Sequence, residues 1–204
     1  MQDEDIDAMT GSDACAAKGG AELAAWRTSE RARLIAERLS GSPESRLSAS
    51  SLILTRLRET VGAIDGRRVG LYWPFRGEPD LRPWVEEIWQ GGGVALLPVV
   101  VEKRQPLQFR SWRTGEPLAR GIWDIPIPAG GEVLEPDVVV APLVGYDPAL
   151  YRLGYGGGFF DRTLAALQQK PFAIGVGYGN QKIATIRPQA HDIPMDVIIT
   201  ADLG

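Results

Sequence analysis

Four short runs of continuous apolar residues, rich in valine and isoleucine, constrain the fold most strongly. They occupy residues 94–101, 138–142, 172–176 and 197–200. Strands buried on both faces of a parallel sheet have this composition, whereas half-exposed strands alternate apolar and polar residues. Helical segments lie between these runs, an alternation typical of parallel strands joined by helices. The sequence therefore predicts an α/β fold, a single three-layer domain with a mainly parallel sheet and helices on both faces.

Other elements are predicted from periodicity and from turn residues. A helix is expected from Glu22, and Gly41 with Pro43 ends it. Residues 68–73 form a short apolar run that indicates the first strand, whereas residues 107–112 alternate and favour an edge strand or half of a hairpin. Further helices are predicted over residues 45–61, over residues 80–90 with Asp80 as the cap, and over residues 159–169.

The composition suits one domain with an acidic start. The chain has 204 residues, of which 44% are apolar and 24% charged, as in a globular protein. Residues 1–20 hold five acids and one lysine, so they account for the whole net charge of −4. Because this stretch is also small and aperiodic, we expect a disordered acidic leader without a catalytic role. Residues 21–204 then form the folded domain.

Hydropathy and charge disfavour a membrane location, a nucleic-acid partner and secretion. The longest apolar run has eight residues and holds a proline, against roughly 20 for a membrane helix, so no membrane association is expected. The body carries 21 charges of each sign, and no basic stripe indicates a nucleic-acid partner. The start lacks the pattern of a secretory signal, which favours a cytoplasmic protein. The oligomeric state stays open, a monomer included.

The chain has one cysteine, Cys15, and one histidine, His191. These counts exclude an intrachain disulfide, zinc fingers and two-histidine metal motifs. Its chemistry must therefore rely on carboxylates, arginines, backbone amides and, at most, a hard metal ion.

A glycine-rich loop is the most informative segment. Four of the residues 154–158 are glycine, and they join a predicted buried strand to a predicted helix. Such a loop can turn successive backbone N–H groups toward one anion, and Arg152 and Arg162 flank it. The pattern is also typical of a tight structural turn, in which Asp161 simply favours the start of the helix. Both interpretations stay open on the residues alone.

Two nucleotide motifs are excluded here. No Gly-Lys-Ser/Thr follows the glycines, and Phe159 occupies the third glycine of the dinucleotide fingerprint. If a polyphosphate binds, Asp161 would repel it unless a divalent cation lay between them. The loop therefore suggests Mg²⁺ in addition to a phosphate ligand.

Residues 152–162, Arg-Leu-Gly-Tyr-Gly-Gly-Gly-Phe-Phe-Asp-Arg, resemble the signature loop of the 5-formyltetrahydrofolate cyclo-ligase family, also called methenyltetrahydrofolate synthetases. The resemblance implies a mainly parallel three-layer α/β fold. It covers most of the chain from about residue 27. It includes residues 71–73, 77–78, 97–98, 121–126, Gln181, residues 191–192 and residues 198–200.

The resemblance implies that ATP is bound by the glycine loop and by two basic residues near the start. Those two become Arg27 and Arg31, which are four residues apart and so share one helix face. Alternatively, both are solvated helix charges. The ATP-binding residues implied are Arg27, Arg31, Arg152, Leu153, Gly154, Tyr155, Gly156, Gly157, Gly158, Phe159 and Phe160.

The resemblance also implies a Mg²⁺ site at Asp161 and Asp192. Neither acid has an obvious cationic neighbour in the sequence apart from Arg162, and Asp192 would otherwise be a turn residue. Arg152 and Glu78 are the residues implied to act in catalysis. The residues implied to bind the folate are Trp73, Glu78, Tyr155, Phe159 and Phe160, with Trp123 as a further aromatic candidate; each alone could instead be a packing or loop residue.

The implied reaction converts 5-formyltetrahydrofolate to 5,10-methenyltetrahydrofolate and releases ADP and phosphate. The sequence departs from the family pattern at Leu150, usually glycine, at Phe160, usually tyrosine, and around residues 79–81 and 124–126. Two alternatives therefore stay open. One is an ATP-binding paralogue that acts on another formyl or carboxyl substrate, and the other is a non-catalytic nucleotide-binding regulator.

Overall fold

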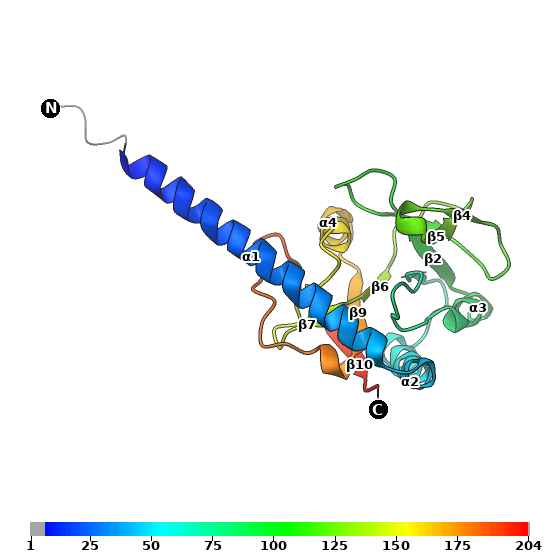
Figure 1. Ribbon diagram of the computed structural model, residues 1–204. Helices are drawn as coiled ribbons and strands as arrows, with labels where there is room; N and C mark the ends of the chain where they lie inside the picture. Colours follow the sequence, from blue (N-terminus) through cyan, green and yellow to red (C-terminus); the bar gives the residue numbers. More distant parts are fainter. Residues whose placement is uncertain (1–6, 204) are drawn as a thin grey trace.

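A central six-stranded sheet organises the molecule (Figure 1). The computed structural model describes residues 7–203, with side chains from residue 19 on. The strand order is β10-β9-β6-β1-β2-β3, and every pair is parallel except β2 with β3. A mixed α/β fold with a mainly parallel sheet is thus confirmed. The strands are β1 (Arg68–Gly70), β2 (Val94–Val99), β3 (Gln108–Ser111), β6 (Val138–Pro142), β9 (Phe172–Tyr178) and β10 (Val197–Ala201).

Helices pack on both faces because the strands present apolar side chains to both. Val138 and Val140 of β6 join the core under α2 (Pro43–Val61) and α3 (Pro83–Gln90). Val139 and Ala141 point to the opposite face, where Leu164 of α4 (Phe159–Ala166) packs. The three-layer description of this arrangement stays a prediction.

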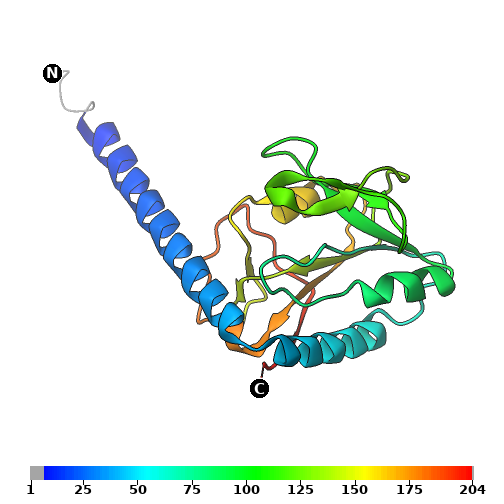
Figure 2. The same ribbon diagram turned by 45° about the vertical axis from the view of Figure 1, so that its right-hand side comes forward.

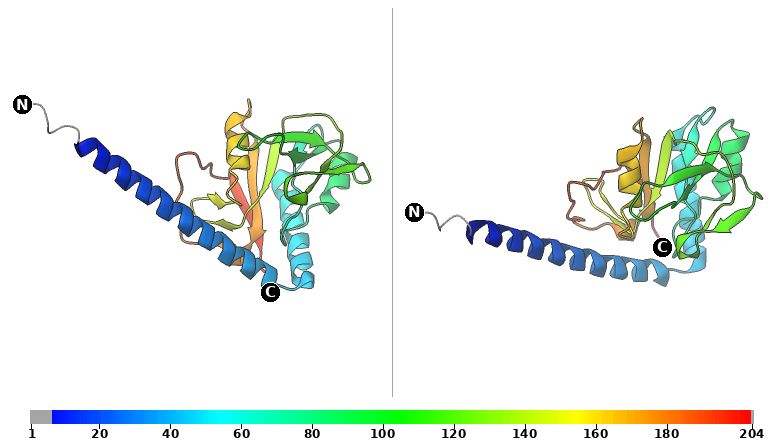
Figure 3. Two further views of the ribbon diagram at one scale, coloured as in Figure 1. Left: turned by 45° about the horizontal axis from the view of Figure 1, so that its top comes forward. Right: turned by 90° about the horizontal axis from the view of Figure 1, so that it is seen from above.

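The first helix, α1, runs from Asp7 to Ser40. Its C-terminal part packs on the domain, with Leu34 buried beside Val144 and Leu153. Figures 2 and 3 show its N-terminal part extending away from the sheet. The structure thus differs from the predicted disordered leader from Asp7 on, since several alanines there favour helix. Residues 1–6 lie outside the described residues, and the absence of a catalytic role stays a prediction.

Two smaller predictions need correction. Asp80 does not cap α3, which begins at Pro83; its Oδ1 atom instead accepts the backbone N–H of Arg82 at 3.0 Å and stabilises the preceding turn. Helix α4 ends at Ala166, earlier than predicted, because Leu167 is already extended. Two short hairpins were not predicted from the sequence. They are β4 (Leu118–Arg120) with β5 (Pro126–Pro128), and β7 (Gly145–Tyr146) with β8 (Arg152–Leu153).

The carboxyl ends of the parallel strands lie at one edge of the sheet. In such folds ligands bind at that edge, in the loops that follow the strands. The loop after β1, the segment from β7 to α4, and residues 179–196 all start there. Among the helices of residues 7–203, none has the length and apolarity that a membrane crossing requires.

Candidate active site

One cavity of about 790 Å³ lies at this edge of the sheet. Its walls come from α1, the loop after β1, the β4–β5 hairpin, the glycine loop and the segment before β10. The structure brings every predicted site residue to this cavity, although their individual roles stay predictions. The predicted residues that line it are Arg27, Arg31, Trp73, Glu78, Arg152, Leu153, Gly154, Tyr155, Gly156, Gly157, Gly158, Phe159, Phe160, Asp161 and Asp192.

The glycine loop has a backbone that other residues would strain. Gly156 has φ +91 and Gly158 has φ +62, both in the left-handed region. A Cβ atom on Gly156 would lie 3.2 Å from Cζ of Arg31. The Arg31 Nε–H donates to the Gly154 carbonyl at 2.7 Å, so the guanidinium is held against the loop. The glycine loop thus packs directly against the Arg31 guanidinium, which also lines the cavity.

Each acid predicted to bind metal is paired with an arginine predicted to bind ATP. Arg152 Nη2 lies 3.0 Å from Asp161 Oδ2, and Arg27 Nη2 lies 2.6 Å from Asp192 Oδ2. The expectation that these acids lack cationic neighbours apart from Arg162 was wrong. The partners are distant in the sequence, and only the fold brings them together.

The Arg27 side chain also ties α1 to the segment before β10. It donates to the carbonyls of Ile186 at 3.2 Å and Arg187 at 2.8 Å. Partial burial raises the pKa of Asp192, but hydrogen bonds from Arg27 and from the Gln189 amide outweigh it and lower the pKa below its usual value. Asp192 is therefore an ionised carboxylate at neutral pH.

The two acids suit a magnesium–nucleotide complex better than a metal held by protein alone. Within the described side chains, no group of three or more His, Cys, Asp or Glu could hold a metal ion. Asp161 Oδ1 accepts the N–H of Ile193 at 3.3 Å, so Asp161 lies beside the segment that carries Asp192. Mg²⁺ in nucleotide sites uses one or two carboxylates and takes its other ligands from phosphates and water. Two carboxylates at one end of the cavity fit this requirement.

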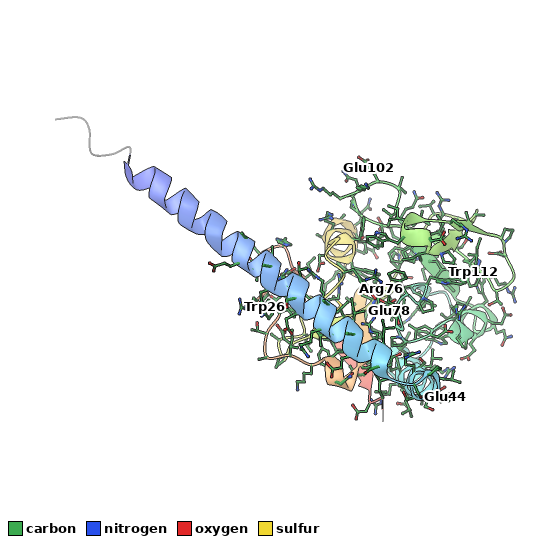
Figure 4. The ribbon with its side chains drawn as sticks, in the orientation of Figure 1. Trp26, Glu44, Arg76, Glu78, Glu102 and Trp112 are labelled. Carbon is green, nitrogen blue, oxygen red and sulfur yellow. The ribbon has the colours of Figure 1, made fainter. Side chains whose placement is uncertain are left out.

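Glu78 forms a buried polar centre at another wall of the cavity. Figure 4 labels it among the side chains of the domain. Its Oε2 atom accepts the N–H of Phe75 at 2.9 Å, whereas Oε1 has no hydrogen-bond partner. Burial raises the pKa of Glu78 to about 7, although the nearby Arg38 guanidinium opposes this shift. Glu78 is therefore present in both protonation states near neutral pH.

Sequence reasoning missed Arg38. Its side chain is fully buried, and its Nη1 atom lies 3.8 Å from Glu78 Oε1. One signal could have found it: residues 27, 31 and 38 are spaced by four and seven, so they share a face of α1.

Aromatic rings surround the remaining cavity wall. Tyr155 lies 5.7 Å from Phe75, and Phe159 lies 6.4 Å from Trp123, measured between ring centroids. The guanidinium of Arg152 lies 5.1 Å from the Phe160 ring centroid. Such rings suit a flat heterocyclic ligand. Phe75 was not predicted, because nothing in its sequence context distinguishes it from a core residue.

These features define a small α/β protein in which an arginine-flanked glycine loop shares one cavity with aromatic rings and a buried glutamate. The sequence model of the 5-formyltetrahydrofolate cyclo-ligase family matches residues 23–201, so the chain belongs to this family. The predicted family and the predicted class, an ATP-dependent cyclo-ligase, are thereby confirmed.

Individual relatives agree with this assignment. The chain is 29% identical over 166 residues to 5-formyltetrahydrofolate cyclo-ligase of Escherichia coli. The aligned region covers 78% of this chain and 91% of the relative. It is 30% identical over 149 residues to the enzyme of the same name from Mycolicibacterium smegmatis, covering 69% of this chain and 77% of the relative.

Solved structures agree as well. The 5,10-methenyltetrahydrofolate synthetase of Aquifex aeolicus superimposes with a TM-score of 0.73 and 29% identity, over 85% of this chain and 89% of that one. The corresponding protein from Mycoplasma pneumoniae has a TM-score of 0.69 over 85% of this chain and 97% of that one. Its 22% identity supports the fold alone.

Proposed function

We propose that this chain converts 5-formyltetrahydrofolate to 5,10-methenyltetrahydrofolate and splits ATP into ADP and phosphate. The observation that carries the proposal is that one cavity joins the arginine-flanked glycine loop to the buried Glu78. Such a site can hold a phosphoryl donor at one end and a flat, polar acceptor at the other. The reacting atoms of the two ligands then meet in a place from which water is excluded.

The glycine-loop end binds the triphosphate in this proposal. Arg27, Arg31 and Arg152 supply positive charge, and the loop supplies backbone N–H groups. Asp161 and Asp192 would hold Mg²⁺, which neutralises phosphate charge when bound. Both acids already lie beside arginines of the proposed triphosphate site, so the groups for both ligands meet at one end of the cavity.

The aromatic end binds the folate. The formyl oxygen attacks the γ-phosphorus of ATP and ADP leaves; N10 then attacks the activated carbon, loses its proton, and phosphate leaves. No side-chain nucleophile is needed, so the protein acts through positioning and charge neutralisation. Glu78 orients the reacting end of the folate, while the rings of Trp73 and Tyr155 contact its flat part.

Three further expectations belong to this proposal. The domain has the three-layer arrangement of the family, the protein works in the cytoplasm, and it needs no nucleic-acid or membrane partner. The neutral charge balance of residues 21–204 supports the last of these.

Release of ADP, measured with and without 5-formyltetrahydrofolate, tests the proposal. We expect one ADP per methenyl product, detected by its absorbance, and no ADP without the folate. Glu78→Gln should leave ATP affinity nearly unchanged and depress folate turnover. ADP release only with a different formyl or carboxyl compound would show a paralogue, and ATP binding without turnover would show a regulator.

A further inference from the structure

We propose that Arg38 is a positioning residue that fixes the Glu78 carboxylate and the Tyr155 hydroxyl for the folate. This inference rests on the proposed function and extends it to a side chain behind the cavity wall. Glu78 and Tyr155 line the cavity, whereas Arg38 is fully buried behind them. Arg38 therefore acts through its neighbours.

The guanidinium of Arg38 contacts both neighbours at once. Its Nη1 atom donates to the Tyr155 hydroxyl at 3.1 Å and lies 3.8 Å from Glu78 Oε1. Its Nη2 atom donates to the carbonyl of Leu143, at the carboxyl edge of the sheet, at 2.5 Å. Because a guanidinium is a rigid planar fork, the contact with Leu143 fixes where the other nitrogen points.

One oxygen of the Glu78 carboxylate is hydrogen-bonded, whereas the other is buried near Arg38 without a hydrogen bond. Oε2 accepts the Phe75 N–H, and Oε1 has no hydrogen-bond partner. A buried pair with a purely structural role normally satisfies its acceptors, because an unpaired buried acceptor is destabilising. An unpaired oxygen on a residue that lines the cavity indicates a place for a donor group of the ligand.

Four groups face Glu78 from the elements packed around it. Arg38 comes from α1, Tyr72 from the segment after β1, Tyr155 from the glycine loop and Tyr178 from the end of β9. Of these four, Arg38 alone is charged at neutral pH, because burial raises the pKa values of all three tyrosines. Arg38 is thus the charged group among them that favours the ionised form of Glu78, and the Tyr155 hydroxyl lowers the pKa of Glu78 to a smaller extent.

The test compares Arg38→Met, which keeps volume and removes charge, with Arg38→Lys, which keeps charge and loses the fork. Arg33→Met is the matched control, since Arg33 lies on the same helix but is half exposed and pairs with Glu30 and Glu37. For Arg38→Met we expect kcat/KM for the folate to fall about 10- to 100-fold at pH 7, with KM for ATP changed less than about twofold.

The pH profile separates positioning from a merely structural role. Removal of the positive charge raises the pKa of Glu78, so the acidic limb of kcat/KM should move to higher pH in Arg38→Met and remain nearer its original place in Arg38→Lys. Arg33→Met should leave it unchanged. The proposal would be overturned if the acidic limb does not move in a folded Arg38→Met variant. It would also be overturned if kcat/KM falls equally for ATP and for the folate. If Arg38→Met fails to fold, Arg38→Lys must show a selective loss toward the folate.

A readout without turnover keeps this inference distinct from the proposed function. Carbon-13 labelling of glutamates, with Glu78→Gln to assign the signal, follows the titration of Glu78 by NMR. A higher pKa in Arg38→Met supports the coupling even if the wild-type protein uses a different substrate. An unchanged Glu78 titration overturns it, whereas absence of folate-dependent ADP release in the wild type refutes only the proposed reaction.

Discussion

Replacement of Gly156 by alanine should damage nucleotide binding more than it damages the fold. Gly156 has φ +91, where a side chain is strained by about 1–2 kcal/mol. Its new methyl group would also meet the Arg31 guanidinium, with Cζ at 3.2 Å and Nη1 at 3.3 Å. Because Arg31 is fixed by the Gly154 carbonyl at 2.7 Å, either the loop or the arginine must shift.

The expected effect follows from those contacts. A displaced Arg31, or one displaced loop amide, removes about one charge-assisted hydrogen bond, worth roughly 1.5–3 kcal/mol, so ATP affinity should fall about 10- to 100-fold. Gly115→Ala is the matched control, because Gly115 has φ +94 and nothing within 4 Å of the added Cβ. It imposes similar backbone strain in a turn outside the residues that line the cavity.

Calorimetric titration with ATP and thermal unfolding of both variants provide the assay. Both variants should lose stability through backbone strain, Gly156→Ala somewhat more because of its contact with Arg31, and only Gly156→Ala should lose ATP affinity. If the two variants bind ATP equally well, or lose it equally, the loop is a structural turn and its role as a phosphate cradle is refuted.

Four other predictions follow from the same site. Arg152→Ala should raise KM for ATP about 10- to 100-fold in steady-state kinetics. Chelation by EDTA should weaken calorimetric ATP binding if Asp161 and Asp192 hold Mg²⁺; equal affinity would contradict this. A chain that begins at Glu22 should keep its Tm and turnover. Since burial raises the pKa of Glu78 to about 7, wild-type stability should fall relative to Glu78→Gln by about 3 kcal/mol as urea denaturation is moved from pH 4.5 to 7.5.

The sheet could be predicted because its central strands are apolar on both faces. Residues 138–142 and 172–176 show no alternation, since one set of side chains packs under α2 and α3 and the other under α4. Parallel strands place the loops that follow them at one edge, and this topology brings the predicted loop residues of the site together. Arg27 and Arg31 reach the same cavity from helix α1. The hairpins β4–β5 and β7–β8 could not be predicted, because strands of two or three residues are too short to show a period.

The ion pairs of the site could not be predicted either. Arg152 and Asp161 are nine residues apart, and Arg27 and Asp192 are 165 apart. Local spacing rules cover only neighbours on one helix or on paired strands. The partner of a charged residue in a loop is decided by which loops the fold places together.

The arginines of helix α1 face the domain, which is unusual for a helix at the surface of a protein. An amphipathic helix usually turns its arginines to water, yet α1 points Arg27, Arg31 and Arg38 at the domain while Leu39 is 50% exposed. Burial of guanidinium groups costs free energy unless partners compensate, and here the partners are Asp192, backbone carbonyls and the pair of Glu78 and Tyr155. We expect Arg27 and Arg31 to bind the anionic triphosphate, and Arg38 on the same face of α1 lies beside the buried acid Glu78.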